Sequence, residues 1–265
     1  MDTDHQRRRR ASIDARPYVV IMKRPTIKLI LSVKSKNWRA EGPDVLEKDE
    51  EYQKIRPKVL KEDDNTCRAC GFKAKEGKWQ EVHHLNDDHE DNSMLNLATL
   101  CSFCHMTQHI GFAGKNGEAR LIWLPEISQT GLHHLVRTIL VTKNEASKRE
   151  DKTVKEMAVQ AMALDTKLRE REVRAKDLIG TNDPEVLGDI LWRLANQGGD
   201  KYYPRREMLL NGIRLLPMGV RKGNEGRNVM ADMITSWTEP GGPYGSGRAI
   251  KDWSAMMSKY APLAR

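Results

Sequence analysis

The sequence contains no long hydrophobic run. Apolar stretches such as Val19–Met22 and Leu29–Leu31 end after a few residues, at Lys23 and Ser32. A helix that crosses a bilayer needs about 20 predominantly apolar residues, so the sequence excludes membrane insertion. The arginines Arg7–Arg10 are followed by ASID and not by the apolar core of a signal peptide, which argues against a cleaved signal. We therefore expect a cytoplasmic protein.

Hydrophobic residues are scarce as well, at 38% of the chain, whereas charged residues make up 31%. This polarity predicts one modest core together with tails and solvated helices. There are 45 basic and 37 acidic residues, for a formal net charge of +8. A surface of mixed sign does not by itself identify a nucleic-acid binder, and we expect the basic residues 1–17 to form a disordered tail.

The sequence has only four cysteines, in two pairs with the same spacing, Cys67-x-x-Cys70 and Cys101-x-x-Cys104. In a reducing compartment this repeated spacing indicates metal ligation and not disulfides. Four thiolates in two such pairs are typical of a structural zinc site. Gly71 supplies the backbone freedom that a tight turn after Cys70 needs. We therefore predict one structural Zn²⁺ bound by all four cysteines.

The apolar pattern predicts an α+β fold in which strands precede helices. The first part combines short strands with two helices: strands within 18–33 that Pro25 separates, a helix over 46–62 with a break or kink at Pro57, strands at 81–85 and 97–100, a helix over 101–110 and a strand at 120–124. The zinc would then clamp the two ends of a small ββα unit.

From residue 128 onward the pattern predicts helices. They cover residues from 128 to about 140, 145–178, 184–196 with Asp183 as N-cap, part of 204–217, and 250–260. The apolar stripe of 145–178 is thin, so we expect that helix to lie on a partner or in solvent. The pair His133-His134 is predicted to lie on a helix surface. In the last helix Trp253, Met256 and Met257 are expected to be exposed or docked.

A second pattern lies between the cysteine pairs: His83-His84, then Asn96, then His105. It resembles the HNH (ββα-metal) nuclease signature. By that resemblance His84 would be the general base, Asn96 would pin the loop that carries the base, and His83 and His105 would hold a second divalent ion. The loop 86–91 is strongly acidic and would repel DNA. A packing role for these histidines in a zinc scaffold therefore stays open.

The resemblance extends over residues 26–217, through IKLILSV, NTCRACGFKAK, QEVHHLN, NLATLCSFC, LIWLPEI and NGIRLLP. These segments are similar to the IcmJ (DotN) family of zinc-binding subunits of type IVB (Dot/Icm) secretion systems and related conjugative machines. In that family the HNH-like fold is a scaffold in the coupling complex, and no nuclease activity is implied. The family zinc ligands map onto Cys67, Cys70, Cys101 and Cys104. The histidines His83, His84 and His105 depart from the family.

The resemblance implies a zinc-stabilised HNH-like scaffold subunit that binds a type IV coupling ATPase and other coupling-complex subunits. Such a subunit would be peripheral to the inner membrane through the complex, with nucleic acid the less favoured partner. The alternative is a metal-dependent HNH endonuclease that cleaves DNA phosphodiesters. The expected division is a basic tail (1–17), an HNH-like ββα zinc domain with N-terminal strands (18–125), an α-helical region (126–217), and a linker with a terminal helix (218–265).

Overall fold

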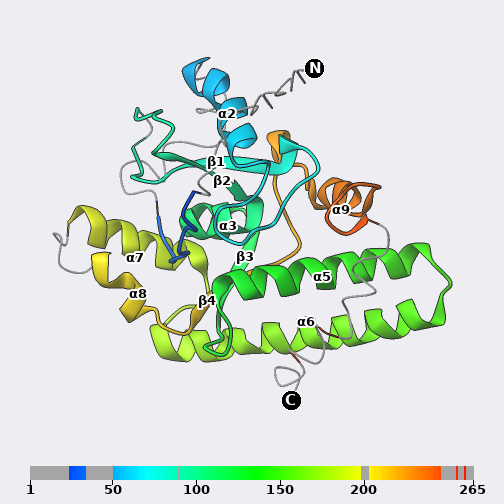
Figure 1. Cartoon of the computed structure of the whole chain (residues 1–265). Helices are drawn as coiled ribbons and strands as arrows, with labels where there is room; N and C mark the ends of the chain where they lie inside the picture. Colours follow the sequence, from blue (N-terminus) through cyan, green and yellow to red (C-terminus); the bar gives the residue numbers. More distant parts are fainter. Residues whose placement is uncertain are drawn as a thin grey trace, which may run out of the picture.

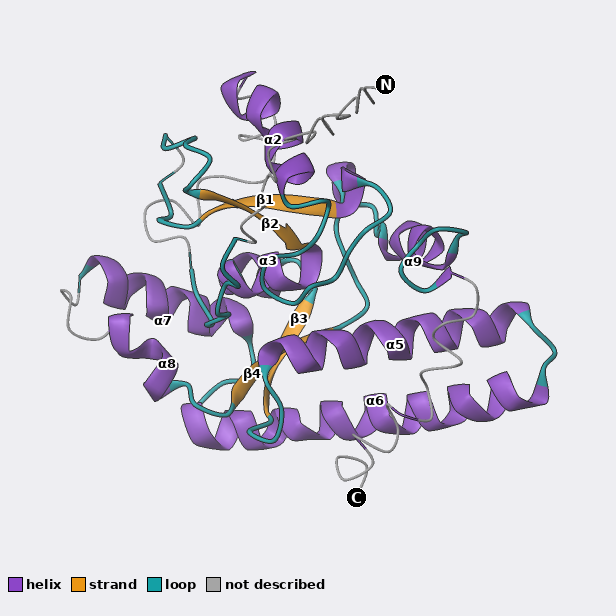
Figure 2. Ribbon diagram, in the orientation of Figure 1, coloured by secondary structure: helices purple, strands orange, loops and turns teal. Residues whose placement is uncertain are grey.

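The computed structural model describes residues 24–33, 50–88, 90–197, 203–245, 255 and 260. Two small antiparallel sheets lie at the centre of these residues, and helices surround them (Figures 1 and 2). One sheet pairs β1 (Gln80–His84) with β2 (Leu97–Cys101), and the other pairs β3 (Ala119–Trp123) with β4 (Ile213–Pro217). This mixture of helices and small sheets confirms the α+β class.

The helices occupy most of the described chain after β2. They are α2 (Glu50–Glu62), α3 (Ser102–Gln108), α4 (Ile110–Lys115), α5 (Gln129–Lys148), α6 (Lys152–Ile179), α7 (Pro184–Asn196), α8 (Arg206–Leu209) and α9 (Met230–Thr238). The helices α5 and α6 form a long antiparallel pair along one side of the molecule (Figure 1). None of the described helices is long and apolar enough to cross a membrane.

The strands β1 and β2 and the helix α3 form a ββα arrangement. Every residue of β2 is buried, because α2 covers one side of this sheet and the larger core lies on the other. The Tyr52 hydroxyl of α2 donates a hydrogen bond to the Val82 carbonyl at 3.1 Å. The helix α2 continues through Pro57, so the expected break does not occur there. Pro57 has no backbone N–H, so the helix lacks one hydrogen bond there. The burial of Tyr52, Val59 and Leu60 on either side of Pro57 offsets this loss.

The apolar stripe of α6 is covered by the protein itself. Its side chains pack against α5 and β3, and the buried members are Val154, Ala158, Ala161, Leu164, Leu168 and Ala175. The expectation that this stripe lies on a partner or in solvent is therefore wrong. The reason is the turn after α5, which brings α6 back along the chain's own apolar surface. The predicted helix start at Asp183 is confirmed, because its carboxylate accepts a hydrogen bond from the Glu185 N–H at 2.8 Å.

Two predicted elements are absent where the structure describes the chain. The described part of the expected N-terminal strands, residues 24–33, is extended but belongs to no sheet. Its backbone bonds instead to the first cysteine turn and to the end of α3, with Ile27 N–H donating to the Arg68 carbonyl and Ser32 N–H to that of Thr107. Residues 18–23 lie outside the described residues.

The prediction of a helix within 204–217 is also wrong. It shrinks to the single turn of α8, because Gly212 adopts a left-handed φ of +83° and Ile213–Pro217 then pairs with β3 as β4. The helix α9 was not predicted, although it buries Met230, Met233, Ile234 and Trp237. Trp253, Met256 and Met257 lie outside the described residues.

Candidate metal centre

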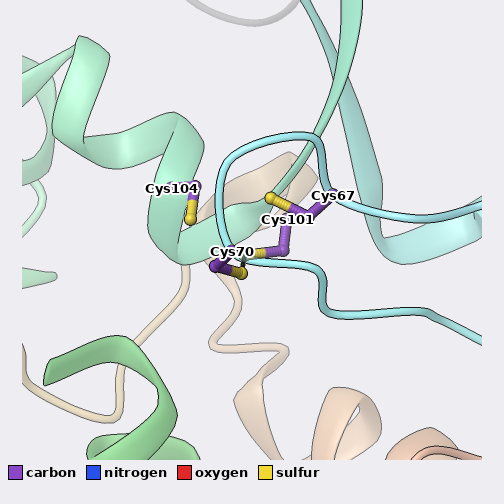
Figure 3. Close-up of side chains that lie close together, drawn as sticks. All are labelled: Cys67, Cys70, Cys101 and Cys104. Carbon is purple, nitrogen blue, oxygen red and sulfur yellow. Dashed lines mark hydrogen bonds between the residues drawn. The ribbon is translucent and has the colours of Figure 1, made fainter. Parts of the chain in front are cut away.

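The fold brings the four cysteines together. Their sulfur atoms all lie within 4.8 Å of one another and surround a common point (Figure 3). The sulfurs of Cys70 and Cys101 are 3.7 Å apart. Two sulfurs on one tetrahedral zinc, with bonds of about 2.3 Å, lie roughly 3.8 Å apart. The arrangement therefore fits a four-coordinate zinc ion with only small adjustments.

Each cysteine pair is placed by a local backbone feature. In the first pair Cys67 N–H donates to the Phe72 carbonyl, and Gly71 N–H donates to the Cys67 carbonyl, both at 2.9 Å. Gly71 has a φ of +73°, which confirms that this turn uses the conformational freedom of glycine. In the second pair Cys101 ends β2 and is the N-cap of α3, and Cys104 lies in the first turn of that helix.

The pKa values of the four thiols are shifted in different directions. Burial raises the pKa of Cys101 and of Cys104 well above the ordinary value. A hydrogen bond with Cys101 lowers the pKa of Cys70 and, to a lesser degree, that of Cys67. Four buried thiolates without a cation would repel one another strongly. Zn²⁺ is the dication that matches this donor set, since coordination holds thiols in the deprotonated form.

A buried arginine from α5 lies against the cysteine cluster. The Arg137 Nη2 donates to the Cys101 sulfur at 2.8 Å and to the Cys70 sulfur at 3.4 Å. Its guanidinium carbon lies 4.3 Å from the ring centroid of Phe72 and 5.3 Å from that of Phe103. Burial alone would lower the pKa of Arg137, but the surrounding charges, those of Cys101 and Cys70 first, together outweigh burial and raise it. The arginine is therefore a permanent counter-charge to the thiolates.

Both histidines of the His133-His134 pair contact the same centre, and the predicted place on a helix surface is wrong for the buried His133. His133 is fully buried, and its Nδ1 donates to the Cys104 sulfur at 3.3 Å while its Nε2 accepts from the Gln129 side-chain amide at 2.8 Å. Burial lowers the pKa of His133 to about 3, so the ring is neutral. The His134 Nε2 donates to the Cys70 carbonyl at 2.9 Å.

The chain beyond residue 217 closes the centre from another side. The Trp237 ring of α9 meets Phe72 edge-on at 5.6 Å and Phe103 at 6.1 Å. The amide of Tyr244 donates to the Trp237 carbonyl at 2.9 Å. The sequence predicted no role for residues 230–237. Its signal was the spacing of Met230, Met233, Ile234 and Trp237, which matches one face of a helix.

The residues of the HNH-like pattern lie beside the four-cysteine cluster but form a separate group. His84 is 2% exposed, and its Nε2 lies 3.1 Å from the Asn92 side-chain oxygen. Asn96 accepts a hydrogen bond from the Asn86 N–H and donates one to the Asp91 carbonyl, so it ties down both ends of the acidic loop. The structure thus gives Asn96 a loop-holding contact and leaves its catalytic role a prediction.

His83 and His105 are brought together with a third ring, that of His109. One nitrogen of each ring lies within 4.8 Å of one nitrogen of each of the other two. His109 was not predicted from the sequence. The spacing His105-x-x-x-His109 is the signal that indicates it, because residues four apart lie on the same face of a helix.

A comparison with known proteins shows the family of this chain. No protein-family model matches the chain. The Type 4 apparatus protein DotN of Legionella pneumophila is 30% identical over 196 residues, which are 72% of this chain and 83% of DotN. This relationship confirms the resemblance found from the sequence motifs, and the chain belongs to the DotN (IcmJ) family of Dot/Icm type IV secretion proteins.

Proposed function

We propose that this protein is a zinc-stabilised scaffold subunit of a type IV secretion or conjugation coupling complex. The observation that carries the proposal is the relationship to DotN over 72% of the chain. The partners we propose are the type IV coupling ATPase and other subunits of the complex. The protein would then be cytoplasmic and peripheral to the inner membrane through these partners.

The zinc ion has a clear task in such a scaffold. The four cysteines come from a turn before β1 and from the junction of β2 with α3, so one ion ties both ends of the ββα unit. The side chains of Arg137 and His133 then connect this unit to α5. We infer that Cys67, Cys70, Cys101 and Cys104 are the structural zinc ligands, in an HNH-like core that carries no catalysis. We retain the division at residues 125 and 217 as part of this proposal.

We place the partner on the helical half of the molecule and away from the acidic loop 86–91. Since the buried stripe of α6 is no longer available, the contact would use a different face of that helix. Val159, Met162 and Val173 are 61%, 48% and 67% exposed, and their spacing places them on one face. Large exposed apolar side chains that share a helix face favour a protein contact.

Co-purification tests the scaffold proposal. The tagged protein is co-expressed with its coupling ATPase, and the complex is isolated in parallel from wild type and from Val159→Glu/Met162→Glu. We expect the ATPase to be retained by wild type and lost from the double variant. A matched control on the same helix, Gln160→Glu/Lys167→Glu, changes residues away from that face and should retain the ATPase. Failure of the wild-type protein to retain any coupling-complex subunit would contradict the proposal.

The second candidate function is a metal-dependent HNH endonuclease. The observation that favours it is the convergence of His83 and His105 beside His84. In this reading His84 would activate water as general base, and the metal would stabilise the leaving oxygen of the phosphodiester. The burial of His84 and the acidic loop beside it weigh against access by DNA.

A plasmid-nicking assay separates the two functions. The purified protein is incubated with supercoiled plasmid and Mg²⁺, Mn²⁺ or Ni²⁺, alongside His84→Ala. Under the scaffold proposal neither protein nicks DNA, and His84→Ala still retains the coupling ATPase. Metal-dependent nicking by wild type that His84→Ala abolishes would establish the nuclease reading instead.

A further inference from the structure

An open groove lies between the extended segment 26–31 and the chain that leads into β4. Its volume is about 470 Å³, within the range of roughly 300–1,000 Å³ that ligand sites occupy. Residues 26–31 form one wall, and residues of α8 and of 210–214 form another. The rest of the lining comes from Ala69 and from residues 128–130 at the start of α5. The residues that line this groove include no cysteine and no histidine, so it is separate from both clusters described above.

The wall formed by residues 26–31 has backbone groups without a backbone partner in the described chain. The Ile27 N–H donates to the Arg68 carbonyl, and the Ser32 N–H donates to the Thr107 carbonyl, both at 3.0 Å. Between these two bonds, the N–H groups of residues 28–31 donate to no backbone carbonyl of the described residues. An extended chain with such an edge is a template for a further strand, and many peptide-binding proteins use one in this way.

This wall is held in place without those backbone groups. The side chains of Ile27 and Leu29 pack against the core, and Leu31 is part of it. On the open side, Lys28 Nζ forms an ion pair with Glu207 of α8 at 2.5 Å, which joins the two walls of the groove. Because the edge is already ordered, an incoming peptide would bind at a lower cost in conformational entropy.

Two arginines give the groove a fixed positive charge. Arg206 donates from Nε and Nη2 to the Ser32 Oγ at 3.2 and 3.1 Å. Arg214 donates from Nε to the Ile127 carbonyl at 2.8 Å. In the described part of the chain, every hydrogen bond of these two guanidiniums goes to an uncharged oxygen. Guanidiniums that are held in place and not neutralised by a carboxylate favour a ligand that carries acidic groups.

We propose that this groove binds an extended acidic segment of a protein partner, which adds as a strand along residues 26–31. A strand rises about 3.3 Å per residue, so a partner segment of about five residues matches the length of this wall. Its backbone would exchange hydrogen bonds with residues 28–31, and its acidic side chains would pair with Arg206 and Arg214. The proposal goes beyond the scaffold function, because it adds a peptide site whose residues differ from the exposed face of α6.

Peptide selection on the full-length protein tests the site. A phage library of random octapeptides is selected on wild type and, in parallel, on Ile30→Pro, which lacks an N–H at the middle of the free edge. We expect peptides rich in Asp and Glu to be enriched on wild type alone, and their synthetic copies to bind with dissociation constants in the micromolar range. A library that yields no peptide specific to wild type, or only peptides without acidic residues, would overturn the proposal.

Two matched changes separate backbone pairing from other effects. Ile30→Ala removes most of the same side chain but keeps the N–H, so it should bind the selected peptide like wild type, whereas Ile30→Pro should bind it about tenfold more weakly. A copy of the peptide that is N-methylated at alternate positions keeps its charges but loses N–H groups, and it should bind wild type at least tenfold more weakly. Equal binding of the methylated and unmethylated peptides would overturn strand addition, whatever the stability of Ile30→Pro.

Hydrogen exchange locates the contact. In the free protein the amides of residues 28–31 should exchange fast, and the selected peptide should slow their exchange. Protection of these amides before peptide is added would show that the chain itself covers this edge, and unchanged exchange after binding would place the peptide elsewhere. Either result overturns the proposal. The variant Val159→Glu/Met162→Glu should bind the peptide like wild type, so loss of the coupling ATPase and loss of the peptide are separate outcomes.

Discussion

Arg137 and Cys101 lie 36 positions apart in the sequence, yet the Arg137 Nη2 donates a hydrogen bond to the Cys101 sulfur at 2.8 Å. This contact links the long helix α5 to the junction of β2 and α3. With the proposed Zn²⁺ bound, the four thiolates would leave two negative charges in a dry environment. The guanidinium would neutralise one of them, which would make the arginine part of the metal centre as well as part of the core.

Loss of Arg137 should therefore weaken zinc binding. In Arg137→Met the buried centre loses its counter-charge and its hydrogen bond, while the packing volume is largely kept. Partners of metal ligands typically contribute about 10-fold to 100-fold in affinity, and we expect a loss in that range. Competition with a coloured zinc chelator measures it. The zinc affinity of Arg137→Lys should lie between those of wild type and Arg137→Met. A zinc affinity of Arg137→Met equal to that of wild type would contradict this role.

The neutral state of His133 predicts a pH dependence of stability. Its pKa is lowered from 6.5 to about 3 in the native state, so the unfolded chain takes up this proton first as the pH falls. The contribution of His133 to the free energy of unfolding is therefore fully present above pH 6.5. It is lost as the pH falls from 6.5 to 3, by up to about 1.4 kcal/mol per pH unit.

The variant His133→Asn tests this dependence, because its amide can donate to Cys104 but does not titrate. Urea unfolding of both proteins at several pH values measures the difference. At pH 7.5 wild type should be the more stable, and its advantage should shrink as the pH falls below 6.5. A stability difference that is the same at pH 5 and pH 7.5 would show that His133 does not titrate in this way.

A buried ion-pair network holds the chain after β4 against both sheets. Glu118 is fully buried and bonds Arg221 Nη1 at 2.9 Å, and Arg221 Nη2 bonds Glu81 at 2.7 Å. Removal of one charge from such a network leaves its partner uncompensated, which costs about 3 kcal/mol. We expect that loss for Glu118→Gln in urea unfolding. The control Glu126→Gln breaks the more exposed pair with Arg171 and should cost less than about 1 kcal/mol.

The helices α4 and α7 approach each other at two glycines. A Cβ atom on Gly188 would lie 2.6 Å from the Gly111 Cα, which is backbone and has no room to yield. We expect Gly188→Ala to separate these helices and to destabilise the fold by about 2 kcal/mol. Arg193→Ala, an exposed change on α7, is the control. Thermal melting compares the two, and equal melting temperatures would refute the close packing.

The sequence predicted best what depends on local spacing. The two C-x-x-C pairs, the turn at Gly71, the strands β1 to β3 and the N-cap at Asp183 all carry their signal within a few residues. What it missed depends on contacts between distant segments. Gly212 ends a short helix, and the strand Ile213–Pro217 exists because β3 is there to pair with it. A single apolar run of that length favours helix and strand about equally.

In the metal centre too, the features set by local spacing were predicted and those set by contacts between distant segments were not. The four cysteines were visible in the spacing, but Arg137 and His133 reach them only because α5 packs on the ββα unit. A polar residue on an amphipathic helix is normally assigned to the solvent side, and this assumption misplaced His133. The prediction for the apolar stripe of α6 was wrong for a related reason. Alanines such as Ala161 and Ala175 are buried between closely packed helices but add little to the hydrophobicity of the sequence pattern.

The central claim is that one zinc ion at four cysteines holds this fold together. Its most direct test is the zinc content of the purified His83→Ala/His109→Ala protein, in which the cluster of His83, His105 and His109 cannot hold an ion, with and without Cys104→Ser. We predict one zinc per chain without Cys104→Ser, and with it no zinc and loss of the cooperative melting transition, because the binding energy of a structural zinc is folding energy. Absence of zinc from the protein with four cysteines, or a Cys104→Ser protein that melts at an unchanged temperature, would contradict the account.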